Sequence, residues 1–402
     1  MQTSNLQTVK RSNRATVLNF IRQREPVSRR GISRELGLSP TTASAAVADL
    51  IDRGLVRESG RGVSTGGRRP IMLEINPKGG LVISVNVRSY LRERIIHAAA
   101  LDLKSSVLQE IKRERIIDSN EAMLDGIKNI IAELVASPQV DLRQALAVGV
   151  SVPGLVNTQT GELVFTNINV KNLALESALS QHLQAPVFVQ NSEDAAALGE
   201  YYFGPEQGCH NLVYFSVGEG IGAGIVIDGQ IHPSGRISAG EIGHLTVQAN
   251  GPLCRCGNRG CLSALVSSQS IVQAVKSALQ AGYIPAADVL ADLPFDELNI
   301  HQVMLAAQAG ETLCRNVLQQ AAEWVGIAVA AVINLLNPEV IVFGGELFEE
   351  GDLFFLLVEE VAQRRALKDY LAGLHFARST LGHSAGLKGA SALAMEALFK
   401  TV

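Results

Sequence analysis

The chain has 402 residues, of which 47% are hydrophobic and 18% are charged. A chain of this length and composition can bury a large core and divide into two or three domains, which excludes a disordered protein. No apolar run reaches the ~20 residues that a membrane-spanning helix requires, and no signal peptide is recognisable. We therefore expect a cytoplasmic protein with no membrane partner.

The net charge of −4 is distributed unevenly along the chain. Residues 1–76 hold 13 Lys and Arg against 6 Asp and Glu, a charge of +7, which leaves −11 for the rest of the chain. This asymmetry predicts a basic module for a polyanion joined to an acidic body. A merely solvated basic face is the alternative, and the motifs within the segment must distinguish the two.

Three helices are predicted in the basic segment. Residues 13–24 place apolar side chains at helical spacing. Ser28 can cap a second helix, and Ser39 can cap a third helix that has Pro40 at its first position, where the missing N–H is harmless. Gly37 lies in the turn between the second and third helices. This order is the layout of a helix-turn-helix.

The third helix is predicted to run from Pro40 to Gly54 and to be the recognition helix. Side chains near the N-terminus of such a helix contact base edges in the major groove. We therefore predict DNA contacts from the small polar residues at its start, which are Ser39, Thr41, Thr42 and Ser44.

Two strands, 55–58 and 71–75, follow the helices and predict a wing. The connecting segment SGRGVSTGGRRP carries Arg61, Arg68 and Arg69 on a glycine-rich ribbon that can reach a phosphate backbone or a minor groove. The alternative is a three-helix unit that docks a protein, with a mobile loop. Charge, caps and arginines together favour binding of a double-stranded DNA operator.

The pattern changes near residue 78, so we place a winged helix-turn-helix domain over 1–78 and a second domain over 79–402. Strands are predicted at 81–87, 95–102, 107–113, 145–150, 187–190, 212–216, 224–227 and 340–344. Helices are predicted at 194–203, 267–281, 312–336 and 387–399, together with one capped by Asn120 that runs to about residue 135. Strand meanders mixed with strand–helix units appear twice, which predicts an α/β body in two halves with a cleft.

The stretch HLTVQANGPLCRCGNRGC, residues 244–261, predicts a zinc site. Zinc prefers four nitrogen or sulfur ligands at tetrahedral corners, and a C-x-C-x4-C loop with glycines can fold back to supply three of them. Those three are Cys254, Cys256 and Cys261, and His244 is the nearest histidine, with His210 and His232 as other candidates. A disulfide or inert thiols are the alternatives. Three thiolates and a histidine fill the shell, so Zn²⁺ here is expected to be structural.

The glycine run from Gly218 to Gly224 is a weaker signal. Such spacing can form a loop around phosphate, but here it lies between two predicted strands and does not open a helix. A tight hairpin explains it equally well.

Taken together, these motifs resemble the ROK family, named for its repressors, open reading frames and kinases. The resemblance spans essentially the whole chain and rests on AGEIGH (239–244) with CRCGNRGC (254–261), and on SVPG (151–154), NSEDAAALGE (191–200), VGEGIGAG (217–224) and VFGGELF (342–348) in the family's order. With its winged helix, the chain looks like the repressor branch, which includes the regulators of glucose and N-acetylglucosamine genes. The resemblance implies an actin/hexokinase-like fold, the zinc site, a sugar pocket beside it, and a homodimer or homotetramer.

The chain departs from the family's kinases at the residues that handle ATP. Family kinases carry an Asp-x-Gly-Gly-Thr phosphate loop where this sequence has Asn86 to Tyr90. They carry Asn-Asp, with the Asp as general base, where this sequence has Asn191 and Ser192. Glu219 replaces a threonine in the second phosphate loop. Loss of a general base alone lowers a rate by about 10²–10⁴-fold. We therefore expect no enzymatic activity.

The resemblance assigns sugar contacts to Asn191, Glu241 and His244. Ser192 and Ser263 replace two carboxylates that hold the sugar in family members, which weakens the expected affinity for an ordinary hexose. Asn167, Asn169 and Asn172 lie in the loop that normally lines the pocket, although turn formation explains them as well. A further alternative is that Glu241 merely orients the zinc ligand His244.

We therefore expect a transcriptional regulator, a repressor of carbohydrate-metabolism genes, whose operator affinity a sugar or sugar derivative modulates. A regulator that is signalled by a protein partner is the first alternative, because the predicted pocket has lost carboxylates. An ATP-dependent sugar kinase is the less favoured alternative.

Overall fold

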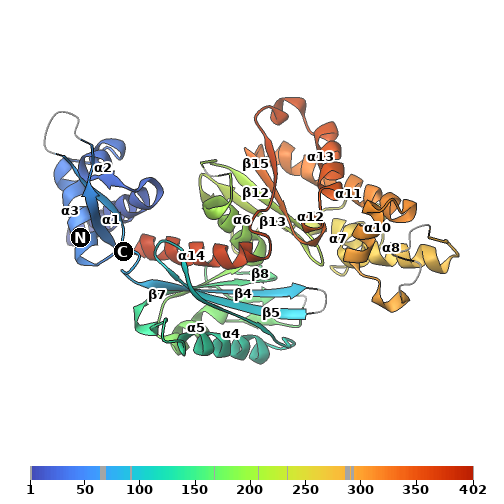
Figure 1. The fold of residues 1–402 in the computed structure, drawn as a ribbon, viewed down its shortest axis with the longest axis horizontal. Coiled ribbons are helices and arrows are strands. Elements are labelled where there is room, and N and C mark those ends of the chain that lie inside the picture. The colour runs from blue at the N-terminus through green and yellow to red at the C-terminus, as the bar shows by residue number, and fades with distance from the viewer. Residues whose placement is uncertain are drawn as a thin grey trace. The chain divides into compact units, whose positions relative to one another are not determined.

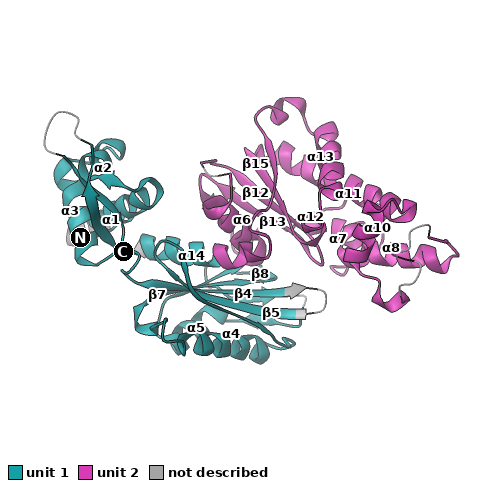
Figure 2. Ribbon diagram, viewed as in Figure 1, with its two compact units in different colours: residues 1–88, 94–190, 390–402 teal, residues 89–93, 191–389 magenta. Residues whose placement is uncertain are grey.

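The computed structural model describes residues 2–63, 69–90, 93–166, 168–206, 208–232, 234–285, 290 and 294–401. The chain forms two compact units, which Figure 2 colours separately. Unit 1 comprises residues 1–88, 94–190 and 390–402, and unit 2 comprises residues 89–93 and 191–389. The chain therefore crosses from unit 1 into unit 2 and returns to unit 1 within its last helix.

Unit 1 begins with a winged helix-turn-helix (Figure 1). Its elements are α1 (Gln2–Arg24), β1 (Val27–Ser28), α2 (Arg29–Glu35), α3 (Pro40–Asp52), β2 (Val56–Arg61) and β3 (Ile71–Ile75). The Ser28 hydroxyl accepts a hydrogen bond from the Gly31 N–H at 3.1 Å, and the Ser39 hydroxyl accepts one from the Thr42 N–H at 3.1 Å. Both predicted helix caps are therefore confirmed.

The wing is longer than the sequence predicts. The three short strands form a sheet in the order β1-β3-β2. The prediction ended β2 at Glu58, but a bulge between Glu58 and Gly60 lets pairing resume, and Arg61 then lies opposite Ile71. A bulge adds one residue to a strand without ending the ladder, which the residue pattern alone does not reveal. The tip of the wing, residues 64–68, lies outside the described residues.

The central sheet of unit 1 has the strand order β11-β7-β4-β5-β6. Its strands are β4 (Leu81–Tyr90), β5 (Glu93–Asp102), β6 (Val107–Glu114), β7 (Ala145–Val152) and β11 (Val187–Asn191). The helices α4 (Asn120–Val135) and α5 (Leu175–Leu183) cover one face and share its apolar core (Figure 1). The last helix, α14 (Ala385–Thr401), packs on the other face. A Cβ on Gly149 would lie 1.8 Å from the Ala390 backbone oxygen, so only glycine permits this close packing.

A small second sheet follows β7, and the sequence did not predict it. It has the order β10-β9-β8, with β8 (Leu155–Val156), β9 (Leu163–Phe165) and β10 (Lys171–Leu173). These strands have only two or three residues each. Segments so short carry too little of the period-two pattern to be recognised.

Unit 2 repeats the strand order of unit 1 as β14-β13-β12-β15-β16. Its strands are β12 (Leu212–Val217), β13 (Ile221–Ile227), β14 (Gln230–Ile231), β15 (Val340–Gly344) and β16 (His375–Arg378). In each sheet three consecutive strands occupy one side, and the next long strand along the chain runs parallel to the first of them, as β7 does to β4 and β15 to β12. This repetition confirms the predicted α/β body of two similar halves.

The helices of unit 2 enclose its core. They are α6 (Ser192–Phe203), α7 (Leu262–Val266), α8 (Ser268–Gln280), α10 (Ile300–Gln308), α11 (Thr312–Leu336), α12 (Glu346–Glu349) and α13 (Leu353–Arg365). Short 3-10 turns lie at Leu142–Gln144, Ile242–His244, Phe295–Glu297, Lys368–Leu371 and Gly382–Ser384. Among the described residues, α11 is long and apolar enough to span a membrane, but 56% of its apolar window is buried and it packs against α13. It is therefore a core helix.

The predicted cap of α4 is wrong by one residue. Ser119 caps the helix, because its hydroxyl accepts a hydrogen bond from the Ala122 N–H at 3.1 Å. The Asn120 side chain instead exchanges two hydrogen bonds with the Lys171 backbone, at 2.9 and 3.1 Å. Ser and Asn are equally good caps, so sequence alone does not choose between neighbours.

Candidate functional site

The loop that follows β14 holds four potential zinc ligands on a framework of backbone hydrogen bonds. The Leu262 N–H donates to the Leu245 oxygen at 2.9 Å, and the Cys254 N–H donates to the Asn258 oxygen at 2.7 Å. Gly260 has φ +69°, and a Cβ there would lie 1.6 Å from the Gln248 backbone oxygen. The glycine therefore allows the chain to fold back tightly enough to bring the last cysteine beside the first two.

The ligand atoms of His244, Cys254, Cys256 and Cys261 all lie within 4.8 Å of one another. The Cys256 and Cys261 sulfurs are 3.7 Å apart, and the Cys254 sulfur is 3.7 Å from His244 Nδ1. Two sulfurs bound to one tetrahedral zinc at about 2.3 Å lie about 3.8 Å apart. The residues therefore fit a zinc ion, and the structure brings together the ligand set that the sequence predicted.

The thiols differ in their readiness to ionise. A backbone hydrogen bond from Asn258 lowers the pKa of Cys256 to about 7, whereas burial raises the pKa of Cys261 to about 12. Zinc binds thiolates, so Cys261 must lose its proton when the metal enters. None of the five cysteines forms a disulfide, which leaves the metal interpretation in place.

The start of α6 holds the predicted sugar residue Asn191. Its side-chain oxygen accepts hydrogen bonds from the backbone N–H groups of Glu193 and Asp194, at 2.8 and 3.2 Å, so Asn191 is the N-cap of α6. The neighbouring Ser192 hydroxyl donates to the Glu193 carboxylate at 2.8 Å. Asn191 is therefore a buried helix cap whose side-chain oxygen is already engaged.

Glu241 and His244 occupy the 3-10 turn that leads into the zinc loop. His244 Nδ1 faces the Cys254 sulfur, while His244 Nε2 lies 4.0 Å from a Glu241 oxygen. Glu241 is therefore on the side of the imidazole that the metal does not use. This arrangement suits both expectations, since a carboxylate there can orient the zinc ligand and also accept a sugar hydroxyl.

Three carboxylates, those of Glu193, Asp194 and Glu241, influence one another near the start of α6. Burial first, and then repulsion from Glu193, raise the pKa of Asp194 to about 8, against a hydrogen bond from the Ile225 backbone. Burial and then Glu193 raise the pKa of Glu241 to about 7, although 44% of its side chain is exposed and water screens part of the shift. Glu193, which was not among the predicted sugar residues, brings a carboxylate one position beyond Ser192.

The glycine run between β12 and β13 forms a hairpin. Val217 pairs with Ile221, and the Gly218 N–H donates to the Gly220 oxygen at 3.0 Å. Glu346, which is buried, fills the space beside this loop, because a Cβ on Gly218 would lie 3.4 Å from Glu346 Cγ. The Ser268 hydroxyl donates to the same carboxylate. A buried carboxylate at this position disfavours a phosphate group.

The segment that stands in place of the first phosphate loop of family kinases belongs to a strand. β4 continues as a strand from Leu81 through Tyr90, so Asn86 and Arg88 are strand residues. Asn169 and Asn172 have φ values of +61° and +49°, which supports their alternative role as turn residues. Asn167 lies outside the described residues.

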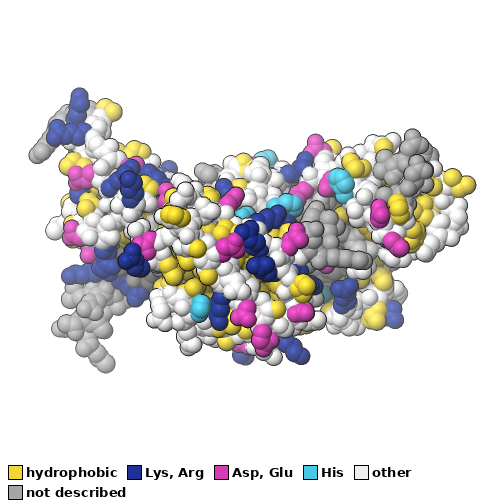
Figure 3. Space-filling view, turned by 60° about the horizontal axis from the view of Figure 1, so that its bottom comes forward, with side chains coloured by type: hydrophobic (Ala, Val, Ile, Leu, Met, Phe, Trp, Pro, Cys, Tyr) yellow, Lys and Arg dark blue, Asp and Glu magenta, His cyan; other side chains and the backbone are white. Residues whose placement is uncertain are grey.

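The predicted DNA contacts occupy two exposed parts of the winged helix. Thr41 and Ser44 are exposed on α3, whereas the Ser39 hydroxyl caps the helix and lies 2.8 Å from the Thr42 hydroxyl. Arg61 and Arg69 line one hollow next to the tip of the wing, and Arg68 lies outside the described residues. Figure 3 shows Lys and Arg side chains on the winged helix, at the left of the view.

The chain is similar to proteins of known family over its whole length. The sequence model of the ROK family matches residues 94–397, and that of the MarR family matches residues 8–68. The chain belongs to the ROK family. It is 32% identical over 402 residues, 100% of this chain, to the DNA-binding transcriptional dual regulator NagC of Escherichia coli, of which it covers 96%. It is also 32% identical to the xylose repressor of Caldicellulosiruptor bescii, over 89% of each chain.

Solved ROK structures separate the two branches of the family. The crystal structure of a ROK family transcriptional regulator, a homologue of the E. coli MLC protein, superposes with a TM-score of 0.86 at 30% identity and covers 98% of both chains. The ROK family glucokinase of Streptomyces griseus, solved with glucose and AMPPNP, gives a TM-score of 0.69 at 28% identity. The superposition covers 99% of the glucokinase but only 78% of this chain. The winged helix is therefore what the regulators share with this chain.

Proposed function

We propose that this protein is a DNA-binding transcriptional repressor of carbohydrate-metabolism genes whose operator affinity a sugar or sugar derivative lowers. The match to NagC over the whole chain, basic winged helix included, is the observation that carries the proposal. Similarity to the N-acetylglucosamine and xylose repressors supports a sugar as the signal.

The protein is a regulator and not an enzyme. Ser192 stands where family kinases have their base, and its hydroxyl is already donated to Glu193. A hydroxyl that stays neutral cannot accept the proton of a sugar hydroxyl at neutral pH. Buried Glu346 beside the β12–β13 loop places negative charge where phosphate would approach.

Zinc is proposed as a structural cofactor, held by His244, Cys254, Cys256 and Cys261. Four protein ligands complete the tetrahedral shell and leave no position for water or substrate. The ion would fix the loop and, through His244, the adjacent turn that carries Glu241. Sugar contacts are proposed from Asn191, Glu241 and His244, with Ser192 and Ser263 in place of two carboxylates.

DNA contacts are proposed from Ser39, Thr41, Thr42 and Ser44 on α3 and from Arg61, Arg68 and Arg69 on the wing. The proposed domains are 1–78 and 79–402, and the proposed assembly is a cytoplasmic homodimer or homotetramer, which would present two recognition helices to two half-sites. A protein partner as the signal is the second candidate. The serines at positions 192 and 263 favour it, because each loses a hydrogen bond worth about 1.5–3 kcal/mol to a sugar.

Operator selection from a randomised DNA library with the full-length protein tests the proposal. We expect a two-fold symmetric site and a steep fall in affinity with salt. Replacing Arg61 and Arg69 with Ala should weaken binding and reduce the salt slope by about one to two phosphate contacts. Failure to enrich any sequence would overturn the DNA-binding function.

A thermal-shift screen of the same protein tests the signal. The ligands are hexoses, amino sugars, pentoses, polyols and their phosphates. A sugar at 100 times its Kd should add about 2.7 kcal/mol to the free energy of unfolding, and the same sugar should weaken the selected operator complex. If no ligand of the panel shifts the melting temperature of the zinc-replete protein, a protein partner is favoured as the signal.

A further inference from the structure

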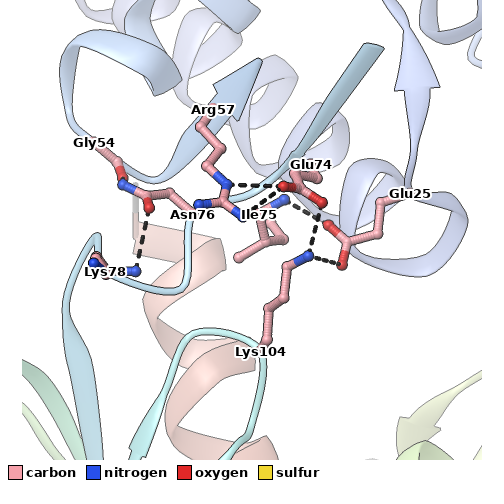
Figure 4. A network of polar contacts seen from close by, with 8 residues as sticks. All are labelled: Glu25, Gly54, Arg57, Glu74, Ile75, Asn76, Lys78 and Lys104. Carbon is pink, nitrogen blue, oxygen red and sulfur yellow. Dashed lines mark hydrogen bonds and ion pairs between the residues drawn. The ribbon is translucent and has the colours of Figure 1, made fainter. Parts of the chain in front are cut away.

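A continuous series of close contacts links the proposed sugar site to the winged helix. What we infer from these contacts rests on the function proposed above for both regions. It begins at α6, whose first residues follow the cap Asn191. It continues through α14, whose residues 385–389 belong to unit 2 and whose residues 390–401 belong to unit 1. It ends at Lys104, which contacts the winged helix (Figure 4).

The first contact in the series joins α6 to the start of α14 within unit 2. A Cβ on Gly389 would lie 1.6 Å from the Ala195 backbone oxygen, and a Cβ on Gly199 would lie 2.4 Å from the Ala385 backbone oxygen. The two helices therefore touch backbone to backbone, with no side chain between them to absorb a displacement. A shift of α6 would therefore press directly on the start of α14.

The second group of contacts joins the rest of α14 to unit 1. Gly149 of β7 packs against Ala390, as described above. The Ser105 hydroxyl, on the turn between β5 and β6, donates to the Met395 sulfur at 3.8 Å. Near the end of α14, the Arg22 guanidinium of α1 lies 5.4 Å from the centroid of the buried Phe399 ring. The helix thus contacts the sheet, the β5–β6 turn and the winged helix in succession.

The β5–β6 turn is itself held rigid. The Asp102 carboxylate accepts hydrogen bonds from the N–H groups of Lys104 and Ser106 at 2.8 and 2.9 Å, and the Ser105 N–H donates to the Asp102 backbone oxygen at 2.9 Å. Leu103 is buried beneath the turn. A turn with this many internal hydrogen bonds moves as one body.

Lys104 reaches from this turn to two glutamates of the winged helix. Its ammonium nitrogen lies 3.1 Å from Glu25, which follows α1, and 3.0 Å from Glu74 on β3, as Figure 4 shows. Glu25 also accepts the Ile75 N–H at 2.5 Å, and Glu74 also pairs with Arg57 at 2.8 Å. One lysine therefore holds both the helical part and the wing of the domain.

The ion pairs of Lys104 shift the pKa values of the residues that form them. The hydrogen bond from Lys104 lowers the pKa of Glu74, with further lowering from Arg57. Burial lowers the pKa of Lys104, but Glu74 and Glu25 outweigh it and raise the pKa overall. All three side chains are mostly covered, with 29%, 23% and 19% exposure for Lys104, Glu25 and Glu74. Ion pairs with partial burial are screened less by salt than surface pairs.

We propose that α14 carries the sugar signal from the start of α6 to the winged helix, and that Lys104 is the positioning residue that fixes the winged helix to the β5–β6 turn. Sugar binding would move α14, and the turn and Lys104 would carry that movement to α1 and β3. Operator affinity would change because the two recognition helices of an oligomer require a fixed spacing.

The test measures coupling in the full-length, zinc-replete protein. Operator Kd is determined with and without N-acetylglucosamine or xylose at saturation, for wild type and for Lys104→Met, Lys104→Arg and Lys78→Met. Lys78 is the matched control, because it is exposed near the same junction and its ammonium has no ion pair among the described residues. Lys104→Arg keeps the charge and tests rescue.

We expect the sugar to weaken wild-type operator binding roughly tenfold, within the range usual for coupled sites. In Lys104→Met this ratio should fall to within about twofold of unity, while the thermal shift that the sugar produces stays as in wild type. Lys104→Arg and Lys78→Met should keep most of the ratio. Full coupling in Lys104→Met, or an equal loss in Lys78→Met, would overturn the proposal, and so would loss of the sugar-induced thermal shift in Lys104→Met.

Hydrogen exchange separates this inference from the proposed function. Lys104→Met should increase exchange of the Ile75 amide, which Glu25 holds, at least about tenfold relative to Lys78→Met, since the opening equilibrium of β3 shifts. Unchanged exchange would show that Lys104 does not hold the winged helix. If the wild-type protein binds no operator, or if no sugar changes its operator affinity, the proposed function itself is wrong. The proposed signal through α14 is then wrong as well.

Discussion

The zinc loop and the start of α6 lie in the same unit, and both gather titratable side chains, but of different kinds. In the zinc loop three thiols and one imidazole converge within 4.8 Å, a set that a single divalent cation satisfies. At the start of α6, burial and then the nearby Glu193 carboxylate raise the pKa values of Asp194 and Glu241. The first arrangement is complete with one ion, whereas the second stores repulsion that a ligand can relieve.

This difference also reflects how the chain builds each region. The zinc ligands come from one loop of 18 residues whose shape glycines determine. The carboxylates come from α6 and from the turn before the zinc loop, about 50 residues apart in the sequence. A contiguous site tolerates little change, while a site assembled from separate elements can lose Asp or Glu at positions 192 and 263 and still fold. The comparison therefore predicts larger effects in the zinc loop.

The largest effect is expected from Cys261→Ser. Serine is a poor zinc ligand. Loss of the Cys261 thiolate would therefore remove both the ion and the loop geometry that the ion fixes. We expect the free energy of unfolding to fall by about 4 kcal/mol or more, and Tm to fall by about 10 °C. Metal analysis after purification without chelator and a thermal melt measure the two. Cys314→Ser, at a buried thiol outside the loop, is the control and should keep its zinc.

A smaller loss of stability is expected from Gly260→Ala when it is compared with Gly257→Ala. Both glycines have positive φ, +69° and +93°, so both alanines are strained by about 1–2 kcal/mol. Only at Gly260 would the new Cβ meet an atom, the Gln248 oxygen at 1.6 Å. We therefore expect Gly260→Ala to destabilise the protein by roughly 2 kcal/mol more than Gly257→Ala. Equal melting temperatures for the two variants would mean that the loop relaxes around the clash.

The sequence alone was sufficient to predict features that depend on residues close together in the chain. The zinc ligands, the caps Ser28 and Ser39, and the strand β15 could all be predicted, because each depends on residues a few positions apart. The contacts of Glu193 could not be predicted. It depends on Ser192 donating to it and on Glu241 approaching from another segment, which are consequences of packing.

Lys104 shows the same limit more strongly. A lysine in a β-turn is ordinarily solvated, and nothing in its neighbourhood in the sequence distinguishes it. Its partners Glu25 and Glu74 are 79 and 30 residues away, on elements that meet it only after the winged helix has packed against the rest of unit 1. By contrast, the bulge in β2 and the two-residue strands were missed because their patterns are too short, not because they depend on distant residues.

A pH dependence follows from the buried carboxylate of Asp194. Its pKa is raised from 3.8 to about 8, so the folded protein holds this proton more tightly than the unfolded chain. The stability therefore falls as pH rises from about 4 to about 8 and then levels off. Asp194→Asn keeps an oxygen for the Ile225 N–H and removes the titration. We expect it to be more stable than wild type at pH 8 by a few kcal/mol, and about equal at pH 4.

Chemical denaturation at pH 4, 6 and 8 measures that dependence. The exposed Glu219→Gln serves as the control and should keep the slope of the wild type. If Asp194→Asn also keeps that slope, the carboxylate is ionised in the folded protein and the stored repulsion at the start of α6 is smaller than the comparison requires.

The smallest effect is expected from Ser192→Asp, which adds the carboxylate that family members use for sugar. A charged acceptor adds about 1.5–3 kcal/mol over none, and the helix N-terminus favours it, but Glu193 beside it opposes it. We expect about a tenfold gain in affinity for a sugar such as xylose, measured by thermal shift across concentrations. Ser277→Asp, on the exposed surface of α8, adds the same charge and should change nothing.

Transfer of phosphate from ATP is the decisive second measurement on Ser192→Asp. The variant supplies a base, but β4 still runs straight through Asn86, and Glu346 still lies beside the β12–β13 loop. Sugar affinity should therefore rise while phosphate transfer stays absent, which would place the loss of catalysis in the phosphate loops as well as in the base. Measurable transfer would instead mean that Ser192 alone separates this regulator from the kinases, and that the carboxylate at Glu346 does not exclude a nucleotide.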